Sequence, residues 1–100
     1  MKYEKIKALY KEPGKAPMLI TVENELHALQ RVIGGNLESH KVTADCCMLC
    51  DEEGRLKGLP FNCHFANLEI VGPILLVGVD GEEFCDIPDY VHGIINWMWS

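Results

Sequence analysis

The chain has 100 residues, of which 48% are hydrophobic and 24% charged, and its formal net charge at pH 7 is −6. These values are typical of one globular domain and exclude a disordered chain. An acidic protein is repelled by phosphate backbones, so we expect no non-specific nucleic-acid binding. The longest apolar run, residues 74–79, is too short to span a membrane, and residues 1–15 lack the apolar stretch of a signal peptide. We therefore predict a cytoplasmic protein whose five cysteines are thiols.

The first two strands are predicted by alternation. Apolar and polar residues alternate over residues 5–10 and again over residues 17–22, as in half-buried strands. Pro13 and Gly14 lie between them and favour a turn, because Pro presets φ and Gly accepts a positive φ. The two segments are therefore predicted to form a hairpin.

The spacing of apolar residues then changes to that of a helix. Leu26, Leu29 and Ile33 share one face at 3.6 residues per turn. Asn24 is a suitable N-cap, and the glycines that begin at Gly34 supply the end of the helix.

The middle of the chain is predicted to be mainly β. The predicted strands are residues 37–43, 44–50, 55–59 and 74–79, the last of them apolar enough to be covered on both faces. A turn is expected over residues 51–54 and another at Asp80-Gly81, because glycine accepts the left-handed conformation. Residues 59–69 have no clear period and are predicted to form a loop.

A second helix is predicted at the C-terminus. Asp86 is a candidate cap, Pro88 suits the first turn, and a core-facing stripe follows: Val91, Ile94, Ile95 and Met98. The expected fold class is α+β, with a small antiparallel or mixed sheet of about five strands and two helices packed on it. The order is β-β-α-β-β-(β)-β-α.

The cysteines raise the question of a metal site. Cys47 and Cys50 have C-x2-C spacing, and Cys63-His64 follows, which is compatible with four zinc ligands. Residues three apart on a strand point to opposite faces, however, so Cys47 and Cys50 should not converge. We predict structural thiols, with a zinc site or a redox pair as the alternatives.

No catalytic centre can be assembled from the sequence. Cys63 and His64 are adjacent, and neighbouring residues rarely face one another as a nucleophile and its base require. We therefore predict a protein without catalytic residues, metal or cofactor. Arg55 and Lys57, with Asn62 nearby, form a candidate site for a small anion, although a solvated strand face is the favoured explanation of the two cations.

The C-terminal third carries the candidate surface for a partner protein. From residue 80 onward there are acidic residues but no Lys or Arg, which favours a partner with a basic surface. The residues assigned to this surface are Glu82, Glu83, Asp89, Trp97 and Trp99. Tryptophan is a frequent interface anchor, and the same pair also suits a homodimer interface.

Four segments together resemble a known family: residues 24–35, 37–38, 50–62 and 72–78. It is a family of domains of unknown function found on phages, plasmids and conjugative elements of Firmicutes. The resemblance covers nearly the whole chain, but Cys63 stands where a basic residue often follows the Asn of the GLPxN segment. It implies a genomic context and carries over no catalytic residues.

The leading functional hypothesis is a non-enzymatic accessory protein of a phage or mobile element that binds a host or effector protein. Its most concrete version is counter-defence, such as inhibition of a CRISPR or restriction effector. The alternative is a sponge that sequesters a nucleotide signal between protomers through Arg55, Lys57 and Asn62.

Overall fold

The computed structural model describes residues 3–91, which form a mostly β protein. The elements are β1 (Lys5–Lys11), β2 (Met18–Glu23), α1 (Leu26–Ile33), β3 (Leu37–Thr43), β4 (Cys46–Asp51), β5 (Phe61–Phe65), β6 (Leu68–Val71), β7 (Ile74–Asp80) and β8 (Glu83–Cys85). Within this range, no helix is long and apolar enough to cross a membrane.

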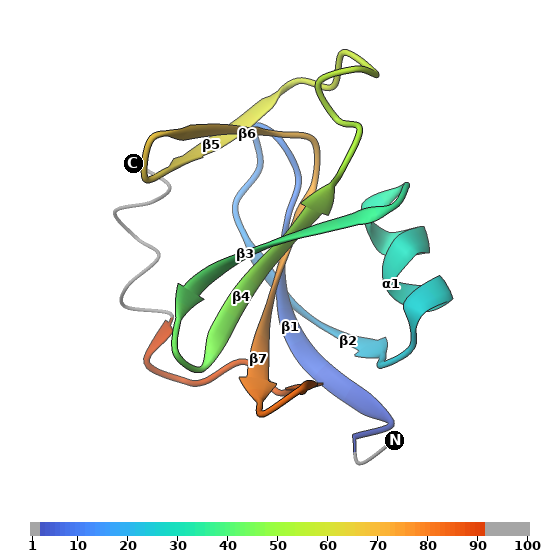
Figure 1. Ribbon diagram of the computed structural model, residues 1–100, viewed down its shortest axis with the longest axis vertical. Helices are drawn as coiled ribbons and strands as arrows, with labels where there is room; N and C mark the ends of the chain where they lie inside the picture. Colours follow the sequence, from blue (N-terminus) through green and yellow to red (C-terminus); the bar gives the residue numbers. More distant parts are fainter. Residues whose placement is uncertain (1–2, 92–100) are drawn as a thin grey trace.

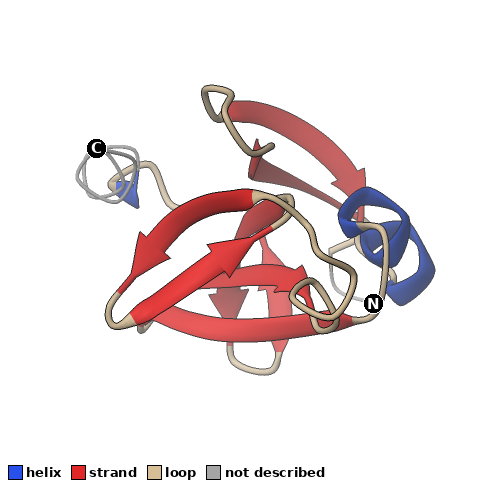
Figure 2. Ribbon diagram, turned by 90° about the horizontal axis from the view of Figure 1, so that it is seen from above, coloured by secondary structure: helices blue, strands red, loops and turns tan. Residues whose placement is uncertain are grey.

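The main sheet is antiparallel and has β7 at its centre. Its strand order is β2-β1-β7-β4-β3, and β8 also pairs with β7. A separate two-stranded sheet is formed by β5 and β6, at the top of Figure 1. Figure 2 shows that the strands are curved and that α1 lies at one side of them. The prediction left an antiparallel or a mixed sheet open, and the structure shows the antiparallel one.

Two apolar cores lie on the two faces of the main sheet. Along β7, Ile74 and Leu76 enter one core, while Leu75 and Val77 enter the other. The first core is closed by β5, β6 and the segment that follows β8, and the second is closed by α1. The prediction that residues 74–79 form a strand covered on both faces is confirmed for its first four residues, none of which has exposed surface.

The N-terminal hairpin and the helix are confirmed, with one correction at the helix start. β1 and β2 pair from Lys5 opposite Glu23, and Gly34 ends α1 in the left-handed conformation at φ 92°. The N-cap is Glu25, not Asn24. The buried Asn24 amide instead donates to backbone carbonyls of Tyr3 and Phe84, each at 3.0 Å, because it lies between β8 and the start of the chain.

Two predictions for residues 55–69 are wrong. Residues 52–58 form consecutive turns rather than a strand, and the Lys57 N–H donates to the Glu53 carbonyl at 2.9 Å. The predicted loop over residues 59–69 instead contains β5 and the first part of β6, which pair as a hairpin. Alternation is hidden there by a β-bulge at Asn62, and the turn carries Ala66 at φ 53° without a glycine to signal it.

The C-terminal prediction can be compared only as far as Val91. Residues 3–91 contain one helix, not two, and strand β8 was not predicted. The Asp86 carboxylate accepts a hydrogen bond from the Lys7 N–H at 2.8 Å instead of capping a helix. The Val91 N–H donates to the Pro88 carbonyl at 3.1 Å, at the end of the described residues. The rest of the predicted helix, including Ile94, lies outside the described residues.

Candidate functional site

An apolar groove of about 310 Å³ opens between α1 and the β7–β8 hairpin. Its apolar lining consists of Leu26, Leu29, Leu37 and Phe84. Leu26 is 57% exposed although the helical pattern placed it on the core-facing side. Leu26 is the first residue of α1, and the core under the helix includes Leu29 and Ile33 but not Leu26.

Three carboxylates surround this groove. Glu25, Glu82 and Glu83 are lining residues, and among residues 3–91 no Lys or Arg lines the groove. The two walls are held together by Asn24, which bonds to the Phe84 carbonyl of β8 immediately before α1 begins. The groove is therefore an apolar site with a negative rim, built on two elements with a fixed spacing.

The structure brings together part of the predicted partner surface. Glu82 and Glu83 both line the groove, and Glu82 is exposed. Asp89 is also exposed, but it lies in the segment after β8 and is not a lining residue. Trp97 and Trp99 lie outside the described residues. The sequence did not identify Leu26 as part of this surface, because exposure of an apolar helical residue has no local signal.

The three residues assigned to a small anion each have partners within the protein. Arg55 donates to the Glu69 carbonyl at 2.8 Å, and Lys57 pairs with Asp51 at 2.6 Å. Asn62 is buried. Arg55 lines a cavity of about 130 Å³ whose other lining residues include Glu38, Asp51, Glu52 and Glu69. So many negative groups around one guanidinium disfavour a phosphate there.

The ion pair between Lys57 and Asp51 anchors the turns that follow β4. Burial acts to raise the pKa of Asp51, but hydrogen bonds from Lys57 and from the Glu53 N–H outweigh it, and the pKa is lowered. The Lys57 ammonium also donates to the Gly34 carbonyl at 3.2 Å. One side chain therefore joins the turns, β4 and the end of α1.

Replacing Lys57 by Met should lower the free energy of unfolding by about 1–2 kcal/mol at pH 7, since Lys57 is partly exposed but the Asp51 side chain is buried. Because the pKa of Asp51 is lowered in the folded state, the contribution exists above about pH 3.9 and disappears as the pH falls through the folded pKa. Urea denaturation at several pH values measures it. Lys15→Met, at an exposed pair with Glu12, should change little. If the free energy of unfolding of Lys57→Met stayed below that of the parent by the same amount in acid, the loss would not come from the ion pair with Asp51.

Four of the five cysteines lie in the two cores, and Cys85 is partly buried. None of the five forms a disulfide. Cys47 packs in the core under α1 and Cys50 in the opposite core, which confirms that the two point to opposite faces. Burial, the largest cause, raises the pKa of Cys47 to about 11 and, with a contribution from Glu38, that of Cys50 to about 12. These thiols are protonated at neutral pH, so they lack the thiolate that nucleophilic catalysis needs.

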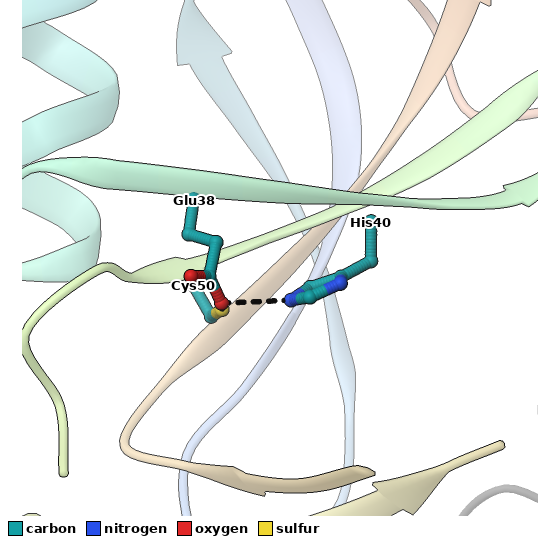
Figure 3. Close-up of side chains that lie close together, drawn as sticks. All are labelled: Glu38, His40 and Cys50. Carbon is teal, nitrogen blue, oxygen red and sulfur yellow. Dashed lines mark hydrogen bonds and ion pairs between the residues drawn. The ribbon is translucent and has the colours of Figure 1, made fainter. Parts of the chain in front are cut away.

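A different set of metal-ligating side chains does converge. Glu38 and His40 of β3 meet Cys50 of β4, as Figure 3 shows. His40 Nε2 lies 2.8 Å from Glu38 Oε2, and the Cys50 thiol donates to the same oxygen at 3.7 Å. The sequence contained these residues, but it did not indicate that they were neighbours, because their contact depends on how β3 pairs with β4.

The fold and these sites define a small, mostly β domain with an acid-rimmed apolar groove. The chain belongs to the family described as domain of unknown function DUF3846, whose model matches residues 6–97. The predicted resemblance is confirmed to the extent that the family is one of domains of unknown function. No curated protein and no solved structure matches the chain.

Proposed function

We propose that this protein acts by stoichiometric binding, and that the groove beside α1 takes an apolar side chain from a basic segment of a partner protein. The observation that carries the proposal is an apolar lining combined with Glu25, Glu82 and Glu83, to which the described part of the chain adds no Lys or Arg.

The two parts of the groove have different physical roles. Carboxylates at a rim accelerate encounter with a basic partner and disfavour acidic ones. Apolar surface in the centre supplies affinity once water is expelled. Leu26 is 57% exposed, and covering it would contribute about 1–2 kcal/mol. A volume of about 310 Å³ is at the lower end for ligand pockets, which suits a side chain better than a whole nucleotide.

The partner class follows from the charge. Effectors that act on nucleic acid have basic surfaces, and an acidic binder can cover such a surface. Counter-defence, by inhibition of a CRISPR or restriction effector, is the setting that we propose for this activity. Asp89, Trp97 and Trp99 are proposed as additional contacts with the partner, Asp89 from the segment that closes the core on the other face of the sheet.

The groove is tested with a synthetic amphipathic peptide of Lys and Leu, and with a Glu and Leu peptide of the same pattern. We expect amide resonances of residues 25–29 and 82–84 to shift with the first peptide and not with the second. Leu26→Asp should abolish the shifts, because it places a carboxylate in the apolar lining. Leu56→Asp is the matched control, since Leu56 is 83% exposed and lies in the turns after β4.

Charge reversal gives a second readout. Glu82→Lys with Glu83→Lys should slow association at least about tenfold and flatten its dependence on salt. The same double variant should fail to protect a phage against the effector in a plaque assay where the unaltered protein protects. Equal binding of both peptides, or a salt-independent association rate, would reject the groove as a basic-segment site. Tight binding of a cyclic nucleotide with no protein partner would support the sponge instead.

A further inference from the structure

A cluster of three metal-ligating side chains lies on the face of the main sheet opposite to α1. In the β3–β4 ladder, Glu38 is paired directly with Cys50. His40 is two residues further along β3, so its side chain leaves the strand on the same face as that of Glu38. The three side chains point toward one another in Figure 3. The ladder therefore sets their positions without any loop.

The distances suit a small cation. The three ligand atoms, Glu38 Oε, His40 Nε2 and Cys50 Sγ, all lie within 4.8 Å of one another. Ligand atoms around tetrahedral zinc are about 3.3–3.7 Å apart, given metal–ligand bonds of about 2.0–2.3 Å. The Cys50 to Glu38 separation of 3.7 Å already meets this value, and the His40 to Glu38 separation of 2.8 Å must open slightly.

The side chains that must adjust are those with room to do so. The Glu38 side chain is 47% exposed and that of His40 is 21% exposed, whereas Cys50 is 3% exposed. The ring of Phe65 packs against the His40 ring with centroids 6.4 Å apart. Cys50 is thus held in place by the core, His40 is oriented by the Phe65 ring, and Glu38 has room to rotate.

The surroundings add negative charge and space. Glu38 and Cys50 line the cavity of about 130 Å³, and its other charged lining residues are Glu52, Glu69, Arg55 and Asp51, the last of which is paired with Lys57. A cavity of this size has room for water beside a bound ion. The local excess of negative groups favours a divalent cation over an anion.

We propose that Glu38, His40 and Cys50 bind one zinc ion, with the fourth coordination position facing this cavity. A sulfur, a nitrogen and an oxygen ligand together match zinc better than they match calcium or magnesium, which prefer oxygen alone. On binding, the Cys50 thiol gives its proton to solvent and the sulfur forms the bond to zinc, which releases a bound water. Three protein ligands and one exchangeable position are the arrangement of zinc sites that bind a further ligand. This site is distinct from the C-x2-C pattern, because Cys47 is on the other face of β4.

Cobalt(II) is the probe, because a cobalt–thiolate bond has a charge-transfer band in the near ultraviolet. Tag-free protein, freed of metal with a chelator, should bind one equivalent with that band, and zinc should displace it. Cys50→Ser should lose the band. Cys47→Ser is the matched control, since it removes a buried thiol from the same strand, and it should keep the band.

Two variants outside the set of fully buried residues reduce the dependence of the test on core packing. Glu38→Gln and His40→Gln should each weaken cobalt binding at least about tenfold. Removing a residue that only hydrogen-bonds to a metal ligand already weakens metal binding by about tenfold or more, and these two residues are proposed as ligands themselves. Circular dichroism should show that both remain folded. Zinc should raise the melting temperature of the parent protein and of Cys47→Ser, but not that of His40→Gln. Absence of a thiolate band in the parent, or unchanged affinity in both glutamine variants, would overturn the proposal.

Discussion

Replacing Gly78 by alanine should lower the free energy of unfolding by about 3 kcal/mol or more, a large part of the stability of a domain of this size. Gly78 lies in the centre of the sheet, paired with Cys46 of β4 and with Cys85 of β8. A Cβ atom added there would overlap the carbonyl oxygen of Asp86 and approach Cys85 Sγ within 2.9 Å. Because the obstacle is backbone, no rotation of a side chain can relieve the overlap. Chemical denaturation followed by circular dichroism measures the loss.

Gly81→Ala separates this clash from simple backbone strain. Gly81 has φ 63° in the β7–β8 turn, and an added Cβ would meet no atom within 4 Å. Its replacement should cost only about 1–2 kcal/mol, the usual cost of an L-residue in the left-handed region. If Gly78→Ala were as stable as Gly81→Ala, the backbone of Asp86 could not lie as close to Gly78 as the structure places it.

Replacing Asn62 by alanine should destabilise the protein by about 3 kcal/mol or more, since buried polar groups that lose their partners cost about 1–3 kcal/mol each. Asn62 is 7% exposed and lies at the bulge of β5. Its Oδ1 accepts from the buried Lys11 ammonium at 2.8 Å, and its Nδ2 donates to the carbonyls of Lys11 and Gly72 at 2.9 and 2.8 Å. One amide thus joins the end of β1 to the β5–β6 hairpin and the residue before Pro73.

Asn67→Ala is the matched control, because Asn67 is an exposed asparagine in the turn of the same hairpin. It should change the melting temperature little. Asn62→Asp adds a further comparison: it keeps an acceptor for Lys11 but loses both donors, so it should be less stable than the parent although it adds an opposite charge beside the ammonium. If Asn62→Ala left the free energy of unfolding nearly unchanged, solvent would have to replace these three hydrogen bonds. That result would contradict their burial.

The periodic elements could be predicted from the sequence. The N-terminal hairpin, α1, β3, β4 and β7 were all expected, because each has the apolar spacing that its burial requires. The opposite orientations of Cys47 and Cys50 followed from the same period. The hairpin over residues 61–71 was missed for a physical reason: the bulge at Asn62 breaks the alternation, and Asn62 turns inward to Lys11, a residue 51 positions earlier.

The sequence by itself determined the local period, the excess of acidic residues around Glu82 and Glu83, and the resemblance to a family of unknown function. Only the tertiary structure decided which of these residues share a surface. The groove exists because the β7–β8 hairpin lies beside α1, which leaves Leu26 exposed. The proposed zinc ligands meet because Glu38 pairs with Cys50 and not with a residue next to Cys50 in β4. A shift of the ladder by one residue would send Cys50 to the other face relative to Glu38, and no single strand's sequence states which register its partner will take.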